Sequence, residues 1–153
     1  MTVRPALFAD IPQIVELGKE ALRRSKYAGF AELQVGEMRA VLAEAIAGAS
    51  KGRSVVLVSE RHDAVQGVLV GAVTPLYCTD VLMASNQFFY VAESGAATAA
   101  LRLLRAFTRW VEQSDRKVVY RMHMNDAITD LGQLDKMMIA AGFSMSGLVY
   151  ERN

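Results

Sequence analysis

The residues with the clearest chemical potential lie where a short apolar strand, Phe88 to Val91, leads through a loop into a long helix. Small residues dominate the loop and the first helical turn, which run through Ser94, Gly95, Ala96, Ala97 and Thr98. Backbone N–H groups at a helix start have no partner within the helix and lie at the positive end of its dipole. This segment therefore predicts a seat for a phosphate or pyrophosphate, and a plain helix N-cap at Ser94 is the alternative.

The other reactive side chains are scattered along the chain. One cysteine, Cys78, and two histidines, His62 and His123, do not make a metal-binding pattern, so the sequence predicts no metal site. Cys78 has no activating base or cation near it in the sequence. His62 fits a hairpin turn. His123 has the pKa range of a general base, although a structural role is favoured for a lone histidine near a strand end.

Hydrophobic periodicity predicts a mixture of strands and helices that positions these residues. Asp10 is expected to cap the first helix. Residues 74–86 show no clear period and are expected to be irregular or a wide hairpin arm. The expected elements are a strand near Val3, helices at 11–22 and 38–48, strands at 55–58, 68–73 and 88–91, a helix at 97–111, a strand at 118–124, a helix at 131–141, and a terminal strand or hairpin at 143–151.

Length and composition predict one domain over residues 1–153. The net charge of +1 argues against a nucleic-acid or membrane partner, and Arg102, Arg105 and Arg109 are read as the solvated face of their helix. The lone cysteine and the absence of an apolar run near the N-terminus favour a cytoplasmic location. A homodimer is left open.

The order of elements resembles the GNAT superfamily of acyl-CoA-dependent N-acyltransferases. Three segments carry the resemblance: Arg4-Pro5-Ala6 with Asp10-Ile11-Pro12, the strand, loop and helix around residues 88–101, and Ala141-Gly142-Phe143 near the end. The chain is most similar in character to short phage- and prophage-borne GNAT-like proteins. The resemblance implies an α/β (α+β) fold with a mixed, mostly antiparallel central sheet flanked by helices. It also implies transfer of an acetyl group from acetyl-CoA to a small-molecule or peptide amine.

The resemblance assigns roles to particular residues. The backbone of Tyr90 and Val91 would bind the cofactor, together with residues 94–98, and the Val91 N–H would polarise the thioester carbonyl. Asn125 would contact the cofactor or order the last helix, and a simple turn residue is an equal reading. Asp80 and Glu93 are the carboxylates expected near the acceptor groove, as proton acceptors or as solvated loop charges. Aromatic side chains expected to line that groove, or only to pack, are Tyr27, Phe30 and Tyr77.

Two departures from the family pattern bear on activity. The loop has no Arg or Gln at the position from which relatives contact the pyrophosphate, and Glu93 places a carboxylate beside it. Met138 occupies the position of the tyrosine that protonates the leaving thiolate in many relatives, and a thioether cannot donate a proton. The sequence therefore predicts either a slow N-acetyltransferase that attacks the thioester directly, or a weak or inert CoA-binding or interaction module.

Overall fold

A computed structural model of the chain describes residues 1–93, 96–114, 118–124, 131–147 and 152. The elements follow in the order β1 (Thr2–Pro5), η1 (Phe8–Asp10), α1 (Ile11–Arg24), α2 (Val35–Gly48), η2 (Ala49–Lys51), β2 (Ser54–Arg61), β3 (Ala64–Pro75), β4 (Leu82–Val91), α3 (Ala96–Glu112), β5 (Val118–Arg121) and α4 (Leu131–Ala140). The described strands form a single sheet in the order β1-β2-β3-β4-β5. No helix in these described ranges is long and apolar enough to cross a membrane.

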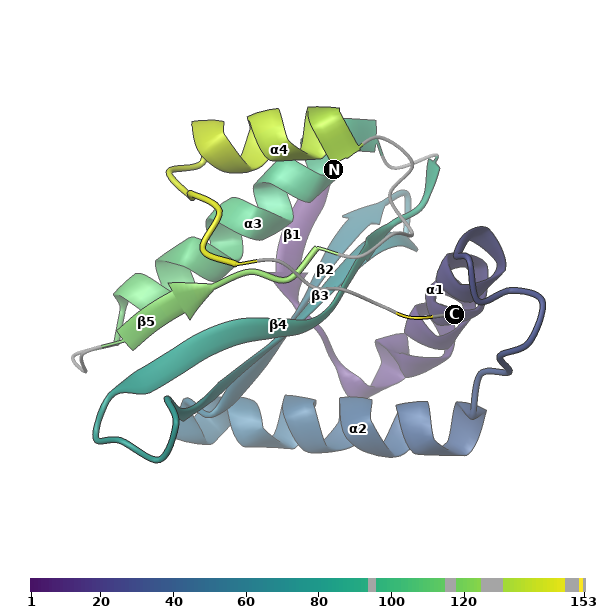
Figure 1. Cartoon of the computed structure of the whole chain (residues 1–153). Helices are drawn as coiled ribbons and strands as arrows, with labels where there is room; N and C mark the ends of the chain where they lie inside the picture. The colour runs from purple at the N-terminus through teal and green to yellow at the C-terminus, as the bar shows by residue number, and fades with distance from the viewer. Residues whose placement is uncertain (94–95, 115–117, 125–130, 148–151, 153) are drawn as a thin grey trace.

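The sheet is mostly antiparallel and is covered by helices on both faces, as predicted. Strands β1 to β4 pair antiparallel in sequence order, whereas β5 pairs parallel to β4. Helices α1 and α2 cover one face and α3 covers the other (Figure 1). On the first face Ile14 and Leu42 pack in one apolar cluster with Tyr90. On the second face, Phe89 packs with Phe107 of α3.

The predicted turn between β2 and β3 is confirmed as a two-residue hairpin. Arg61 pairs with Ala64, and His62 and Asp63 between them have φ angles of 52° and 61°. Two consecutive residues with positive φ are the signature of a type I′ turn, whose twist matches that of the strands. His62 is therefore a turn residue, which is the role that the sequence favoured.

Helix α3 follows its predicted amphipathic pattern. Leu103, Leu104 and Phe107 are fully buried, while Arg102, Arg105 and Arg109 are exposed. The ring of Phe107 lies directly over Gly71 of β3, where a Cβ atom would come within 2.6 Å of the ring Cζ. A glycine is required there because any side chain would collide with this ring.

Three expected boundaries are wrong. The strand expected at 88–91 begins earlier, at Leu82. Strand β3 continues to Pro75 and a short loop follows, so of the two readings of residues 74–86 the wide hairpin arm is confirmed and the irregular segment is not. The alternation of apolar and polar residues expected of a strand is interrupted here, because the polar residue Asn86 is buried in the middle of β4. Strand β5 ends at Arg121 and does not reach Met124. Residues 143–147 are not in a strand, and the rest of the predicted terminal strand lies outside the described residues.

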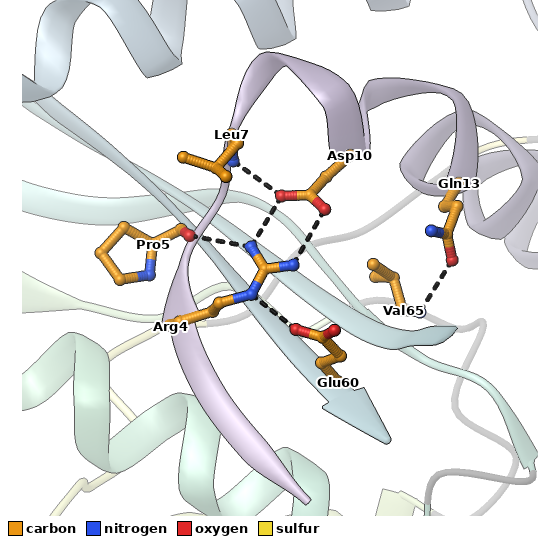
Figure 2. Close-up of polar contacts among 7 residues, drawn as sticks. All are labelled: Arg4, Pro5, Leu7, Asp10, Gln13, Glu60 and Val65. Atoms are coloured by element: carbon orange, nitrogen blue, oxygen red, sulfur yellow. Dashed lines mark hydrogen bonds and ion pairs between the residues drawn. The ribbon is translucent and has the colours of Figure 1, made fainter. Parts of the chain in front are cut away.

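A polar cluster ties the start of α1 to the sheet (Figure 2). Two guanidinium nitrogens of Arg4 donate to the Asp10 carboxylate, at 2.8 and 3.0 Å, and the Nε atom donates to Glu60 at 2.6 Å. Asp10 also accepts from the Leu7 N–H at 2.7 Å. Asp10 was predicted to cap α1, but it makes no cap hydrogen bond to that helix. Its carboxylate instead holds the turn that precedes α1 against β1 and β2.

This cluster predicts a pH-dependent contribution to stability. The hydrogen bond from Arg4 holds the pKa of Asp10 below its usual value of 3.8, against the opposing effect of burial. Because the pKa is lower in the folded state, the contribution is complete above about pH 4 and is lost as the pH falls through the folded-state pKa. Replacing Asp10 with asparagine is expected to lower the free energy of unfolding at pH 7 by about 1.5–3 kcal/mol.

Urea unfolding of the native protein and of Asp10→Asn between pH 7 and pH 2.5 checks this prediction. The difference between them should shrink below pH 4. Asp63→Asn is the matched control, because Asp63 is exposed and asparagine tolerates its positive φ. An Asp10→Asn difference that stays constant down to pH 2.5 contradicts the assignment.

Candidate functional site

Strand β4 separates from β5 part-way along its length. A bulge at Gln87 shifts the register between β3 and β4, so that Val70 opposes Phe88 while Gly71 opposes Asn86. Pairing with β5 extends only from Leu82 to Ser85. The two strands are thus neighbours, and beyond the bulge the described part of β4 pairs only with β3. Among the described residues nothing pairs with the other side of this strand end, and this side is called the open edge.

The hydrogen bonds between β3 and β4 determine which backbone groups of β4 face this open side. The Ala92 N–H donates to the Gln66 carbonyl at 2.9 Å, on the β3 side. Because hydrogen-bonded positions alternate along an antiparallel ladder, Tyr90 also directs its N–H and C=O toward β3. Phe89 and Val91 direct theirs to the open side. The structure thus agrees with an available amide at Val91 but not at Tyr90, and it adds Phe89, which the sequence pattern did not identify.

Asn86 bridges the two strands at the point where they separate. Its Nδ2 donates to the His123 carbonyl at 2.7 Å, and its Oδ1 accepts from the His123 N–H at 2.7 Å. The side chain thus replaces one rung of the ladder just after β5 ends. The backbone of His123 is held in this way while its side chain is exposed, which supports a structural role for this residue. Nothing in the local sequence marked Asn86, because its partner lies 37 residues away.

Helix α3 begins close after the open end of β4. Its first turn contains Ala96, Ala97 and Thr98, and the Thr98 side chain is exposed. The first N–H groups of a helix have no partner within it, so they are available to an anion. The predicted cofactor contacts Ser94, Gly95 and Asn125 lie outside the described residues.

Glu93 does not stand as an isolated negative charge beside the helix start. Its carboxylate pairs with Nη2 of Arg24, in the last turn of α1, at 2.9 Å. The same guanidinium donates from Nη1 to the Tyr90 hydroxyl at 3.2 Å, and that hydroxyl donates to Glu20 at 2.9 Å. Burial raises the pKa of the Tyr90 phenol, so it remains a protonated donor. No local pattern identified Arg24 or Glu20, because their contacts with Tyr90 join segments distant along the chain.

Asp80 and Tyr77 lie at the other end of β4. Both belong to the loop at residues 76–81, which precedes β4, whereas Val91 and Glu93 are at or just beyond its end. Ten residues of strand separate the two ends, a length of roughly 33 Å at 3.3 Å per residue. Asp80 therefore cannot act on the same atom as the Val91 amide, and its predicted catalytic role is corrected. Tyr77 is 79% exposed and is likewise remote from this end.

The structure brings together the other two predicted aromatic residues. Tyr27 and Phe30 lie in the loop after α1, with ring centroids 5.7 Å apart in an edge-to-face arrangement. Phe30 is 80% exposed. This loop and the loop carrying Tyr77 lie at opposite ends of the molecule (Figure 1). Tyr77 therefore cannot line one groove with Tyr27 and Phe30, whose place in an acceptor groove stays a prediction.

Met138 lies half-buried on α4, close to the end of that helix. Its carbonyl accepts from the N–H groups of Ala141 and Phe143, and Gly142 between them has a φ angle of 90°. This is a glycine-terminated helix end, in which the glycine takes the positive φ. Phe143 then packs edge-to-face on Tyr120 of β5, at 4.7 Å. Burial raises the pKa of Tyr120 to about 12.

The described residues contain no group of three or more His, Cys, Asp or Glu side chains placed to hold a metal ion. Cys78 is exposed in the loop before β4. The candidate site of the described chain consists of the open edge of β4, the start of α3 and the contacts of Arg24 with Tyr90 and Glu93.

The sequence matches no protein-family model and no curated protein sequence. The fold, in contrast, matches solved acetyltransferases along their whole length. A putative acetyltransferase from Agrobacterium tumefaciens str. C58 is 14% identical with a TM-score of 0.72, over 100% of this chain and 99% of that chain. Glucosamine-6-phosphate N-acetyltransferase from Arabidopsis thaliana is 8% identical with a TM-score of 0.72, over 99% and 97%.

An aminoglycoside N-acetyltransferase in complex with CoA is 13% identical with a TM-score of 0.70, over 99% of this chain and 98% of that chain. These likenesses confirm the predicted GNAT-like fold. At identities of 8–14% this is a likeness of fold.

Proposed function

We propose that this protein is an N-acetyltransferase that moves an acetyl group from acetyl-CoA to a primary amine by direct attack. The observation that carries the proposal is the open edge of β4, where Phe89 and Val91 turn their backbone groups away from the sheet just before α3 begins. Proteins of the same fold include acetyltransferases, one of them in complex with CoA.

The residues of this chain fit such a ligand. The open backbone groups of Phe89 and Val91 suit the amides of the pantetheine arm, because a strand edge pairs readily with an extended chain. Residues 94–98 would hold the pyrophosphate through backbone N–H groups. Glu93 does not oppose this, because Arg24 neutralises its carboxylate.

The chemistry needs orientation, a donor at the carbonyl oxygen and a route for one proton. Bound acetyl-CoA supplies an activated thioester with a thiolate leaving group. The Val91 N–H would donate to the thioester oxygen. Glu93, which is 82% exposed, would accept the amine proton directly or through water. With Met138 in place of the usual tyrosine, we expect slow turnover.

The acceptor proposed here is a small-molecule or peptide amine. One protein of this fold is an aminoglycoside acetyltransferase in complex with sisomicin, which supports a small cationic amine as the first class to test. Tyr27 and Phe30 would contact it. A cytoplasmic location, a homodimer and kinship with phage- or prophage-borne proteins remain predictions from the sequence.

Thermal unfolding with acetyl-CoA tests the proposal. Ligand at about a hundred times its dissociation constant should add roughly 2.7 kcal/mol to stability. Thr98→Glu places an anion in the first turn of α3 and should weaken acetyl-CoA binding by about tenfold or more, through repulsion of the phosphates.

Thr74→Glu is the matched control for this variant, since Thr74 is also exposed but lies near the far end of the sheet. Release of free thiol with sisomicin and glucosamine 6-phosphate as amines then tests transfer. If acetyl-CoA adds no stability to the native protein, the inert-module alternative is favoured.

A further inference from the structure

We propose that Arg24 is a positioning residue for the acetyl transfer proposed above, on which this inference rests. Through Tyr90 and Glu93, Arg24 ties the last turn of α1 to the end of β4 and so orients the Val91 amide. These four residues, Glu20, Arg24, Tyr90 and Glu93, are called the clasp below.

The end of β4 needs such a tie. Up to Ser85 the strand has neighbours on both sides, but from the bulge onward its described pairing is with β3 alone. A strand end held from one side has fewer constraints on its twist and opens at lower cost. The open side must stay free for a ligand, so any second anchor has to come from above or below the sheet.

Tyr90 supplies that anchor from the α1 face. Its side chain is 2% exposed and points to the opposite face from Phe89, since neighbouring strand residues alternate. Its hydroxyl is engaged twice, as acceptor from Arg24 at 3.2 Å and as donor to Glu20 at 2.9 Å. With this ring fixed, the peptide planes on either side of it are fixed as well, and the next of them carries the Val91 N–H.

Arginine is suited to this position because its planar fork reaches two acceptors at once. Nη1 contacts Tyr90 and Nη2 contacts Glu93, on two sides of Val91 in the chain. A lysine has a single nitrogen and would keep one contact at the expense of the other. Glu20 and Arg24 lie four residues apart on α1, so both project from one face of the helix.

The clasp also lies between the loop proposed to contact the amine and the strand end proposed to contact acetyl-CoA. Residue 25 begins the loop that carries Tyr27 and Phe30, and Ser25 closes α1 through hydrogen bonds to Leu22 and from Tyr27. Arg24 thus contacts the strand end that faces the thioester and directly precedes the residue at which the proposed acceptor loop begins.

Residue-resolved hydrogen exchange tests the clasp without any ligand. In Arg24→Gln the amides of Tyr90 and Ala92, which are bonded to β3, should exchange at least about tenfold faster than in the native protein. Arg23→Gln is the matched control, with the same charge change on an exposed neighbour, and should leave these rates unchanged. Tyr90→Phe removes only the hydroxyl and is the milder variant, should Arg24→Gln fold poorly. Unchanged rates in both variants overturn the clasp.

Steady-state kinetics of Tyr90→Phe test the positioning role, because this variant preserves the Arg24–Glu93 pair and the net charge. Turnover with the better of the two amines should fall about tenfold while the acetyl-CoA dissociation constant stays within about threefold, the signature of lost orientation at the reacting carbonyl. If Tyr90→Phe exchanges these amides faster but turns over at the native rate, the clasp is purely structural and the positioning role is overturned. A native protein that binds no acetyl-CoA overturns the proposed function and the positioning role with it, whereas the exchange data still report on the clasp.

Discussion

Replacing Phe107 with alanine is expected to lower the free energy of unfolding by about 3–5 kcal/mol. The side chain is fully buried at the centre of the α3 face. Its ring stacks on Trp110 at 5.5 Å and meets Tyr120 edge-to-face at 5.3 Å. Gly71 beneath it has no side chain that could move into the space. The cavity would therefore remain open, and the transfer and cavity costs would add.

Urea unfolding measures this loss. Phe30→Ala is the matched control, because it deletes the same atoms from a side chain that is 80% exposed. It should change stability by less than about 0.5 kcal/mol, as surface substitutions usually do. A loss below 1 kcal/mol for Phe107→Ala would show that the α3 face is less closely packed than the contacts indicate.

Replacing Asn86 with alanine is expected to cost about 2–4 kcal/mol and to weaken acetyl-CoA binding. Asn86 is 8% exposed, and its amide satisfies both the N–H and the C=O of His123 at 2.7 Å. Each part-buried backbone group left without a partner costs about 1–3 kcal/mol. Loss of this bridge would also release β5 from the point where β4 separates from it, so the proposed binding edge would lose its shape.

Unfolding and acetyl-CoA titration of three variants check this. Gln87→Ala removes a neighbouring amide that is exposed, and it should behave as the native protein does. Asn86→Asp keeps an acceptor for the His123 N–H but sets a carboxylate oxygen against the His123 carbonyl, so it should not rescue stability. Equal stability of Asn86→Ala and Gln87→Ala would contradict the bridging role.

The sequence by itself determined the features that depend on local periodicity and turn chemistry. The buried and exposed sides of α3 follow from the spacing of Leu104, Phe107 and Arg105. The hairpin at His62 and Asp63 and the glycine-terminated end of α4 follow from residues that tolerate positive φ. The order of the elements was also sufficient to predict that Val91 lies just before the start of a helix.

Only the tertiary structure decided the features that depend on partners distant in the chain. Asn86 was hidden within an apparently irregular segment because the backbone that satisfies it belongs to His123. Arg24 and Tyr90 meet across 66 positions, which no local pattern records. Asp80 and Glu93 appear close along the chain, yet an extended strand places them at opposite ends of the sheet. Periodicity reports which side of an element is buried, whereas the partner of a buried polar group is set by how the elements pack.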